Sequence, residues 1–107
     1  MISPRTVKVK ACELRELAEG SGKLVTVSGK AVALFRVGER AVAVDAECPH
    51  EGGPLQDGTI EDGCVVCPWH HYKFELTSGQ CDIDPSLKVN TYPTAIEAGT
   101  VVVEVVG

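Results

Sequence analysis

Cysteine and histidine are concentrated in one stretch of this 107-residue sequence. All three histidines and four of the five cysteines lie between residues 48 and 81. Among them are two short motifs, Cys48-Pro49-His50 and Cys67-Pro68-Trp69-His70, with sixteen residues between them. Thiolate and imidazole are soft to borderline ligands, which suit zinc or iron–sulfur chemistry and do not suit calcium or magnesium. The motifs therefore predict a zinc or iron–sulfur centre at Cys48, His50, Cys67 and His70.

The other cysteines do not indicate a disulfide framework. Five is an odd number, and residues 1–10 are polar and alternating, without the apolar segment of a secretory signal. We therefore expect a cytoplasmic protein, in which disulfides are rare. We expect Cys64 and Cys81 to be packed or partly exposed thiols rather than ligands. Cys12 is expected to act as a small apolar residue beside the first strand.

β-Strands must position the two motifs. Sixteen residues are valine, which favours strands. Apolar and polar residues alternate, or apolar residues run together, in segments that predict strands at 6–11, 24–28, 31–37, 40–45, 87–91, 95–97 and 101–106. Hairpin turns are predicted at 28–30, 38–39 and 98–99, and one or two helical turns within 13–19.

Between the fourth and fifth predicted strands the chain is rich in Gly, Pro, Cys, His and Asp. Only short apolar pieces occur there, around residues 60, 64–66 and 74–76. We predict an all-β protein with one domain over residues 1–107. Its scaffold, an antiparallel sandwich or barrel, would comprise 1–45 and 87–107, with a loop-rich subdomain inserted at about 46–86. Long loops in a small domain usually carry function.

The two motifs continue as Cys48-Pro49-His50-Glu51-Gly52-Gly53-Pro54-Leu55 and Cys67-Pro68-Trp69-His70-His71-Tyr72-Lys73-Phe74. These residues resemble the Rieske two-iron, two-sulfur proteins, in particular the small soluble Rieske-type ferredoxins. The resemblance implies the Rieske fold and one [2Fe-2S] cluster in the inserted subdomain. It also implies that Cys48 and Cys67 bind one iron and that His50 and His70 bind the other. Two imidazoles in place of two thiolates make such a cluster less negative and raise its reduction potential.

Four residues depart from the patterns of this family. Gly53 and Trp69 stand where high-potential Rieske proteins carry two further cysteines joined in a disulfide. Tyr72 replaces a serine that donates a hydrogen bond to a bridging sulfide, and His71 replaces a residue that is more often glycine. Fewer hydrogen bonds leave the reduced cluster less stabilised, so we expect a potential of roughly −150 mV rather than about +300 mV. We expect Trp69 to be partly exposed near the cluster and His71 to lie at the surface.

The resemblance implies a one-electron carrier and not an enzyme in its own right. The sequence has no Gly-x-Gly-x-x-Gly fingerprint and no Walker lysine motif, so a separate flavin reductase would supply electrons and a terminal oxygenase would receive them. An alternative is the small Rieske subunit of an NAD(P)H-dependent nitrite reductase, whose partner is the large subunit. An alternative of another class is a zinc-stabilised interaction module, which uses the same four residues or Cys64-x-x-Cys67 with histidines.

Charge and hydropathy narrow the class of partner. The net charge of −5 argues against nucleic acid, and no run of about 20 apolar residues predicts a membrane span. Nine acidic residues lie between 45 and 84, where Lys73 is the one Lys or Arg. On charge alone we favour a solvated face over a patch that steers a basic partner. We expect redox partners to dock near His50 and His70.

Overall fold

The computed structural model describes residues 6–49, 52–69 and 71–106. The strands are β1 (Thr6–Glu13), β2 (Gly22–Val27), β3 (Lys30–Val37), β4 (Arg40–Asp45), β5 (Thr59–Glu61), β6 (Cys64–Val66), β7 (Lys73–Glu75), β8 (Thr91–Tyr92), β9 (Thr94–Glu97) and β10 (Thr100–Val106). Two short 3-10 helices, η1 (Leu14–Glu16) and η2 (Leu55–Asp57), complete the regular structure of these residues. No helix in the described part of the chain has the length and apolarity needed to cross a membrane.

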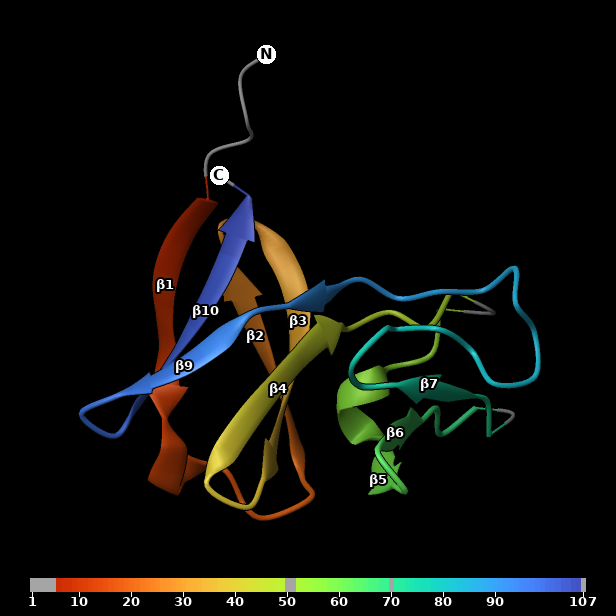
Figure 1. The fold of residues 1–107 in the computed structure, drawn as a ribbon, viewed down its shortest axis with the longest axis horizontal. Coiled ribbons are helices and arrows are strands. Elements are labelled where there is room, and N and C mark those ends of the chain that lie inside the picture. Colours follow the sequence, from red (N-terminus) through yellow and green to blue (C-terminus); the bar gives the residue numbers. More distant parts are fainter. Residues whose placement is uncertain (1–5, 50–51, 70, 107) are drawn as a thin grey trace.

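The scaffold consists of two antiparallel sheets (Figure 1). One has the strand order β1-β10-β9, and the other has the order β2-β3-β4-β8. A core of small and branched side chains lies between them, in which Val32 and Leu34 of β3 pack in the same cluster as Val101 and Val103 of β10. All four are fully buried. The predicted all-β antiparallel scaffold is confirmed.

Strand β3 is covered on both of its faces. Val32 and Leu34 belong to the scaffold core, whereas Ala33 and Phe35 belong to a second cluster of buried residues. Successive side chains of a strand point to opposite faces of the sheet, so the second cluster lies on the outer face of β3. The continuous apolar run from Val32 to Phe35 follows from this position between two cores.

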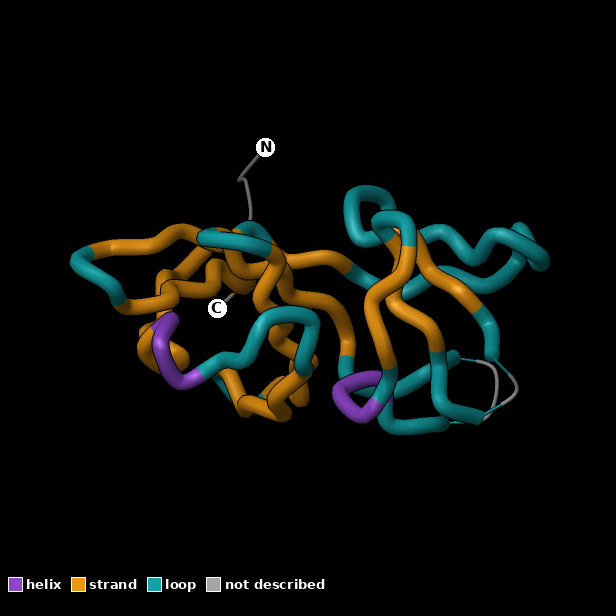
Figure 2. The backbone as a smooth tube through the Cα atoms, turned by 90° about the horizontal axis from the view of Figure 1, so that it is seen from below, coloured by secondary structure: helices purple, strands orange, loops and turns teal. Residues whose placement is uncertain are grey.

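The second core joins the scaffold to the inserted segment. Its members from that segment include Leu55, Val65 and Phe74, which are fully buried, together with Cys48 and Cys67. Strands β5, β6 and β7 form a small antiparallel sheet of their own. Figure 2 shows this part beside the scaffold along the long direction of the molecule. Burial of apolar surface therefore holds the small sheet and both cysteines against the outer face of β3.

A cluster of hydrogen bonds, which we call the neck, closes the inserted segment where it leaves and rejoins the scaffold. The Asp45 carboxylate at the end of β4 accepts one hydrogen bond from the Tyr92 hydroxyl (2.5 Å) and one from the Asn90 amide (2.8 Å). The Asp45 amide donates to the Asn90 carbonyl (3.0 Å). The neck thus fixes both ends of the insert with one side chain.

The strand predicted at 87–91 is wrong. Only Thr91 and Tyr92 join a sheet, as β8. The preceding residues bond to the insert instead: the Val89 amide donates to the Gly79 carbonyl (2.9 Å), and Leu87 accepts from the Cys81 amide (3.1 Å). A Cβ atom at Gly79 would collide with the Val89 carbonyl oxygen, so this close approach requires glycine. The other predicted strands are confirmed, and the helical segment is the single turn η1.

The neck generates a prediction for Tyr92→Phe. Burial, and then the hydrogen bond and charge of Asp45, raise the pKa of Tyr92 from 10 to about 12. The folded state therefore favours the neutral phenol, and this contribution to stability is complete below pH 10 and is lost as the pH rises through 12. Tyr92→Phe should lower the free energy of unfolding by about 1–2 kcal/mol at pH 8. Urea denaturation followed by circular dichroism at pH 8 to 12 measures the difference.

The difference between the two proteins should shrink as the pH approaches 12. A difference that stays constant from pH 8 to pH 12 would show that the Tyr92 hydroxyl does not stabilise the neck through its proton. Thr26→Val on the exposed side of β2 is the control, because it removes a hydroxyl outside the neck and should show no such change with pH.

Candidate metal centre

The first cysteine loop follows β4 and is closed by its own backbone. The Gly52 amide donates to the Cys48 carbonyl (2.7 Å), and the Cys48 amide donates to the Gly53 carbonyl (2.8 Å). Gly52 has φ +77°, a left-handed conformation that glycine adopts without steric cost. The loop therefore turns sharply, and it leaves Cys48 only 2% exposed.

The second cysteine loop connects β6 to β7. The Cys67 amide donates to the Tyr72 carbonyl (2.8 Å), which closes the loop, and Cys67 is 1% exposed. His71 is exposed and has φ +59°. The predicted surface position of His71 is confirmed, and its left-handed backbone explains why glycine would fit there.

The two loops touch at Gly53. A Cβ atom added at Gly53 would lie 2.9 Å from the Cys67 Sγ atom and 3.2 Å from the Cγ and Cδ2 atoms of Trp69. The second loop therefore packs directly against a backbone atom of the first. Trp69 is 48% exposed, as predicted. Gly53 and Trp69, which occupy the positions of the missing disulfide, are in contact.

Two of the four predicted ligands, His50 and His70, lie outside the described residues. The structure brings the loops of the other two, Cys48 and Cys67, together as buried thiols in one core. Their neighbours Pro49, Pro68 and Trp69 are exposed, so both loops run from the core to the surface. Within residues 6–49, 52–69 and 71–106, no three His, Cys, Asp or Glu residues group as a metal site.

The other cysteines pack as predicted. None of the five is in a disulfide. Cys81 is buried beside Phe74 in the second core, Cys64 is partly exposed on β6, and Cys12 packs against the scaffold core. Burial raises the pKa of the Cys64 thiol, and the charges of Asp82 and Glu75 raise it further.

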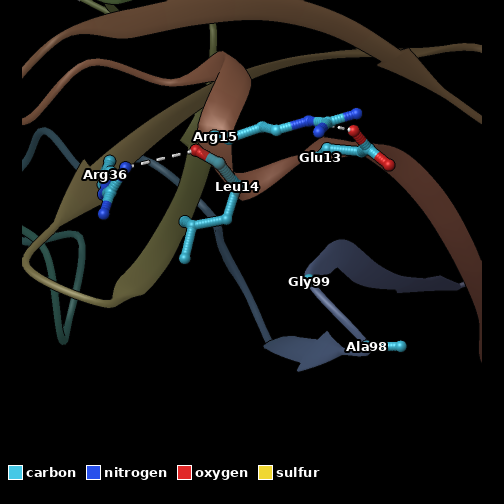
Figure 3. A pocket seen from close by; sticks show the side chains of 6 residues that line it. All are labelled: Glu13, Leu14, Arg15, Arg36, Ala98 and Gly99. Carbon is cyan, nitrogen blue, oxygen red and sulfur yellow. Dashed lines mark hydrogen bonds and ion pairs between the residues drawn. The ribbon is translucent and has the colours of Figure 1, made fainter.

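A separate pocket of about 370 Å³ lies on the scaffold (Figure 3). It is lined by Glu13, Leu14, Arg15, Arg36, Ala98 and Gly99. Both of its arginines already have partners, since Arg15 pairs with Glu13 and Arg36 donates to the carbonyls of Leu14, Leu17 and Gly38. Neither cysteine loop contributes to this pocket, so we give it no role in the metal centre.

Sequence reasoning missed the neck and the contact between Gly53 and Trp69. Asp45 carries no sequence signal beyond its place at the end of a predicted strand, and its partners are 45 and 47 residues away. The glycines at 52 and 53 indicate that another part of the chain can approach this backbone closely, but the sequence does not show that Trp69 is the residue that does so.

The fold and this pair of adjoining loops define a small β domain that buries two cysteines in one core. The model of the Rieske [2Fe-2S] domain family matches residues 7–93. The chain is 33% identical over 97 residues to the ferredoxin component of a naphthalene 1,2-dioxygenase system of Pseudomonas aeruginosa, covering 90% of this chain and 93% of that protein. The chain belongs to the Rieske [2Fe-2S] domain family.

Solved structures agree with this family. A protein assigned as the small subunit of an NADH-dependent nitrite reductase from Mycobacterium tuberculosis superposes with a TM-score of 0.90 at 30% identity, covering 96% of this chain and 98% of that one. The ferredoxin of Sphingomonas yanoikuyae B1 gives a TM-score of 0.81 at 26% identity, covering 92% and 99%. The predicted Rieske fold is confirmed.

The cofactor of this protein is a Rieske [2Fe-2S] cluster, and the described residues fit it. Cys48 and Cys67 are buried and outside any disulfide, and cysteine is the residue type that one iron of such a cluster requires. Gly53 offers no side chain that would occupy the space beside the Cys67 sulfur. The family favours iron and sulfide over the zinc alternative.

His71 generates a prediction about the second loop. A β-branched side chain is a strong outlier at φ +59°, so His71→Val should lower the free energy of unfolding by about 1–2 kcal/mol. His71→Gly should stay within about 1 kcal/mol of the original protein, because relief of the strain offsets the greater backbone entropy of unfolded glycine. Urea denaturation of both variants measures the difference. Equal stability of the valine and glycine variants would contradict the left-handed conformation.

Proposed function

We propose that this protein carries single electrons from a flavin reductase to a terminal oxygenase, with Cys48, His50, Cys67 and His70 as the ligands of one cluster. One observation carries the proposal: two loops, each with a buried cysteine that forms no disulfide, meet at Gly53. Relatives similar over nine-tenths of the chain are ferredoxin components of dioxygenase systems. Such a component transfers electrons and catalyses no substrate reaction itself.

The same proposal assigns the parts of the chain. Residues 1–107 form one Rieske domain, with a scaffold at 1–45 and 87–107 and a cluster-binding subdomain at about 46–86. Cys48 and Cys67 would bind one iron through thiolates, and His50 and His70 would bind the other through imidazoles. The bound cluster supplies reversible one-electron chemistry near the low end of the Rieske range.

The protein's own residues favour transfer at this site in two ways. The cysteine sulfurs are removed from water, which protects the donor atoms from oxidation and exchange. Exposed Pro49, Pro68 and Trp69 place the outer parts of both loops at the surface, where a partner can approach. We propose that redox partners dock there, near His50 and His70.

A partner that docks on the insert would meet acidic residues, so its matching surface would be basic. Exposed acidic residues of the insert include Glu47, Asp57, Glu61, Asp62, Glu75 and Asp82. Lys73 is the one Lys or Arg between residues 45 and 84. A segment with this excess of acidic charge would raise the rate at which a partner with a basic surface associates.

A second candidate is the small Rieske subunit of a nitrite reductase. The TM-score of 0.90 and the near-complete coverage of both chains with the Mycobacterium tuberculosis protein favour it. Purification from the native source distinguishes the two candidates. A nitrite reductase subunit would remain bound to a large subunit through gel filtration, whereas a ferredoxin would elute alone.

The proposed ligands predict the effect of cysteine substitution. Anaerobically purified protein should contain about two irons and two acid-labile sulfides per chain and should show a Rieske-type electron paramagnetic resonance signal after reduction with dithionite. Cys67→Ser should abolish the signal, and His70→Cys should change it and lower the midpoint potential. Cys64→Ser is the matched control, because Cys64 is a nearby thiol that we do not assign as a ligand, and it should retain the cluster.

Two results would contradict this assignment of the ligands. One is stoichiometric zinc without iron after anaerobic reconstitution. Another is a loss of the cluster in Cys64→Ser while Cys67→Ser retains it. A positive midpoint in a redox titration would contradict the expected potential alone.

The proposed docking surface predicts a dependence on salt. Association of the oxidised protein with the flavin reductase of its own system should slow by about tenfold between roughly 20 mM and 300 mM ionic strength, because salt screens exposed charges. The double substitution Glu47→Gln and Asp82→Asn should weaken this dependence. Stopped-flow measurement gives the rate constants.

The matched control is Glu39→Gln with Glu97→Gln, which removes two exposed acidic charges from the scaffold. It should change the salt dependence less than the double substitution in the insert. Equal effects of the two double variants, or rates independent of salt, would remove the proposed docking surface.

A further inference from the structure

The contact between Gly53 and Trp69 has a geometry that points to a role beyond filling space. The two Trp69 atoms nearest to Gly53, Cγ and Cδ2, are both in the indole ring, and both would lie 3.2 Å from an added Cβ atom. Gly53 is buried, whereas Trp69 is 48% exposed. One part of the indole ring therefore rests on the backbone of the first loop while the remainder faces solvent.

The Cys67 sulfur lies on the same side of Gly53 as this ring. Its Sγ atom would be 2.9 Å from the added Cβ atom, so Gly53, Cys67 and Trp69 meet at one point. The loops are not joined there by a covalent bond, because none of the cysteines forms a disulfide. Each loop is closed by a backbone hydrogen bond of its own cysteine amide. The packing of Trp69 on Gly53 is a contact that joins one loop to the other.

We propose that Trp69 is a positioning residue that packs on Gly53 and so fixes the loop of Cys67 against the loop of Cys48. Its indole also shields the Cys67 sulfur from water on that side. A large, rigid aromatic ring gives much contact area for little loss of conformational entropy. This inference rests on the proposed function only in taking Cys67 as a ligand of the cluster.

The first test follows cluster loss in the holoprotein. The cluster's visible absorption is recorded over time in aerobic buffer with the chelator EDTA. Trp69→Ala should lose its absorption at least tenfold faster than the original protein, because the loops are no longer fixed together. Trp69→Phe keeps a ring at this position and should stay within about threefold. Ile83→Ala is the matched control, since Ile83 is another exposed apolar residue of the insert, and its rate should not change.

The outcomes separate the inference from the proposed function. If Trp69→Ala loses its cluster at the original rate, or if Trp69→Phe is as fast as Trp69→Ala, the positioning role is wrong and the electron carrier stands. If the original protein binds no cluster even after anaerobic reconstitution, the proposed function is wrong. The second test then still decides whether the contact exists.

The second test uses fluorescence and needs no cluster. Trp69 is the only tryptophan in the sequence, so its emission reports on this contact alone. The methyl group of Gly53→Ala should displace the ring and shift the emission maximum to longer wavelength in the apoprotein. It should also speed cluster loss in the holoprotein. Gly63→Asn is the control, because an added Cβ atom there meets nothing within 4 Å and asparagine tolerates the left-handed backbone of Gly63 (φ +77°). An unchanged emission maximum in Gly53→Ala would overturn the proposed contact.

Discussion

The approach of two cysteine loops to one another is the constraint on which the site depends, and it requires that residue 53 have no side chain. A methyl group there would stand 2.9 Å from the Cys67 sulfur, closer than Cβ atoms approach other heavy atoms in folded proteins. The sharp turn at Gly52 brings Gly53 to this point, and the burial of both cysteines follows from the packing of the loops into one core. Each loop is closed by its own backbone, so the relative position of the two depends on what lies between them.

The scaffold supports this arrangement through the outer face of its second sheet. Because β3 is buried on both faces, the core of the insert rests on side chains that the scaffold has already aligned. The neck then holds the two ends of the insert through one carboxylate. A substitution in either feature would therefore shift the cysteine loops without replacing a ligand.

Much of this architecture could be predicted from the sequence. The cysteine and histidine motifs are local, and their residue types limit the chemistry to a few metals. The alternation of apolar and polar residues predicts most of the strands, because a strand that buries one face has an apolar side chain at every second position. Both kinds of signal are contained within short windows of sequence.

The features that could not be predicted depend on contacts between distant residues. The segment 87–90 has the composition of a strand, but its backbone groups bond to Gly79 and Cys81 rather than to a sheet. In the sequence, nothing distinguishes Asp45 from other residues at the ends of strands. Its role follows from the hydrogen bond that it accepts from the distant Tyr92 hydroxyl. The packing of Trp69 on Gly53 likewise joins two residues that lie sixteen positions apart in the sequence.

The position of β10 has a consequence for the order in which the protein folds. β10 lies at the centre of its sheet, between β1 and β9, yet it is the last strand in the sequence. During synthesis β1 cannot pair until β10 has been made. In the finished sheet Thr6 pairs with Val106 and Glu13 pairs with Thr100, so the two strands are nearly a hundred residues apart in the sequence. Pairing over such separations is slow compared with the formation of helices. The edge of β1 is open to other chains in the meantime, and its exposed Lys8 and Lys10 are the type of residue that discourages such aggregation.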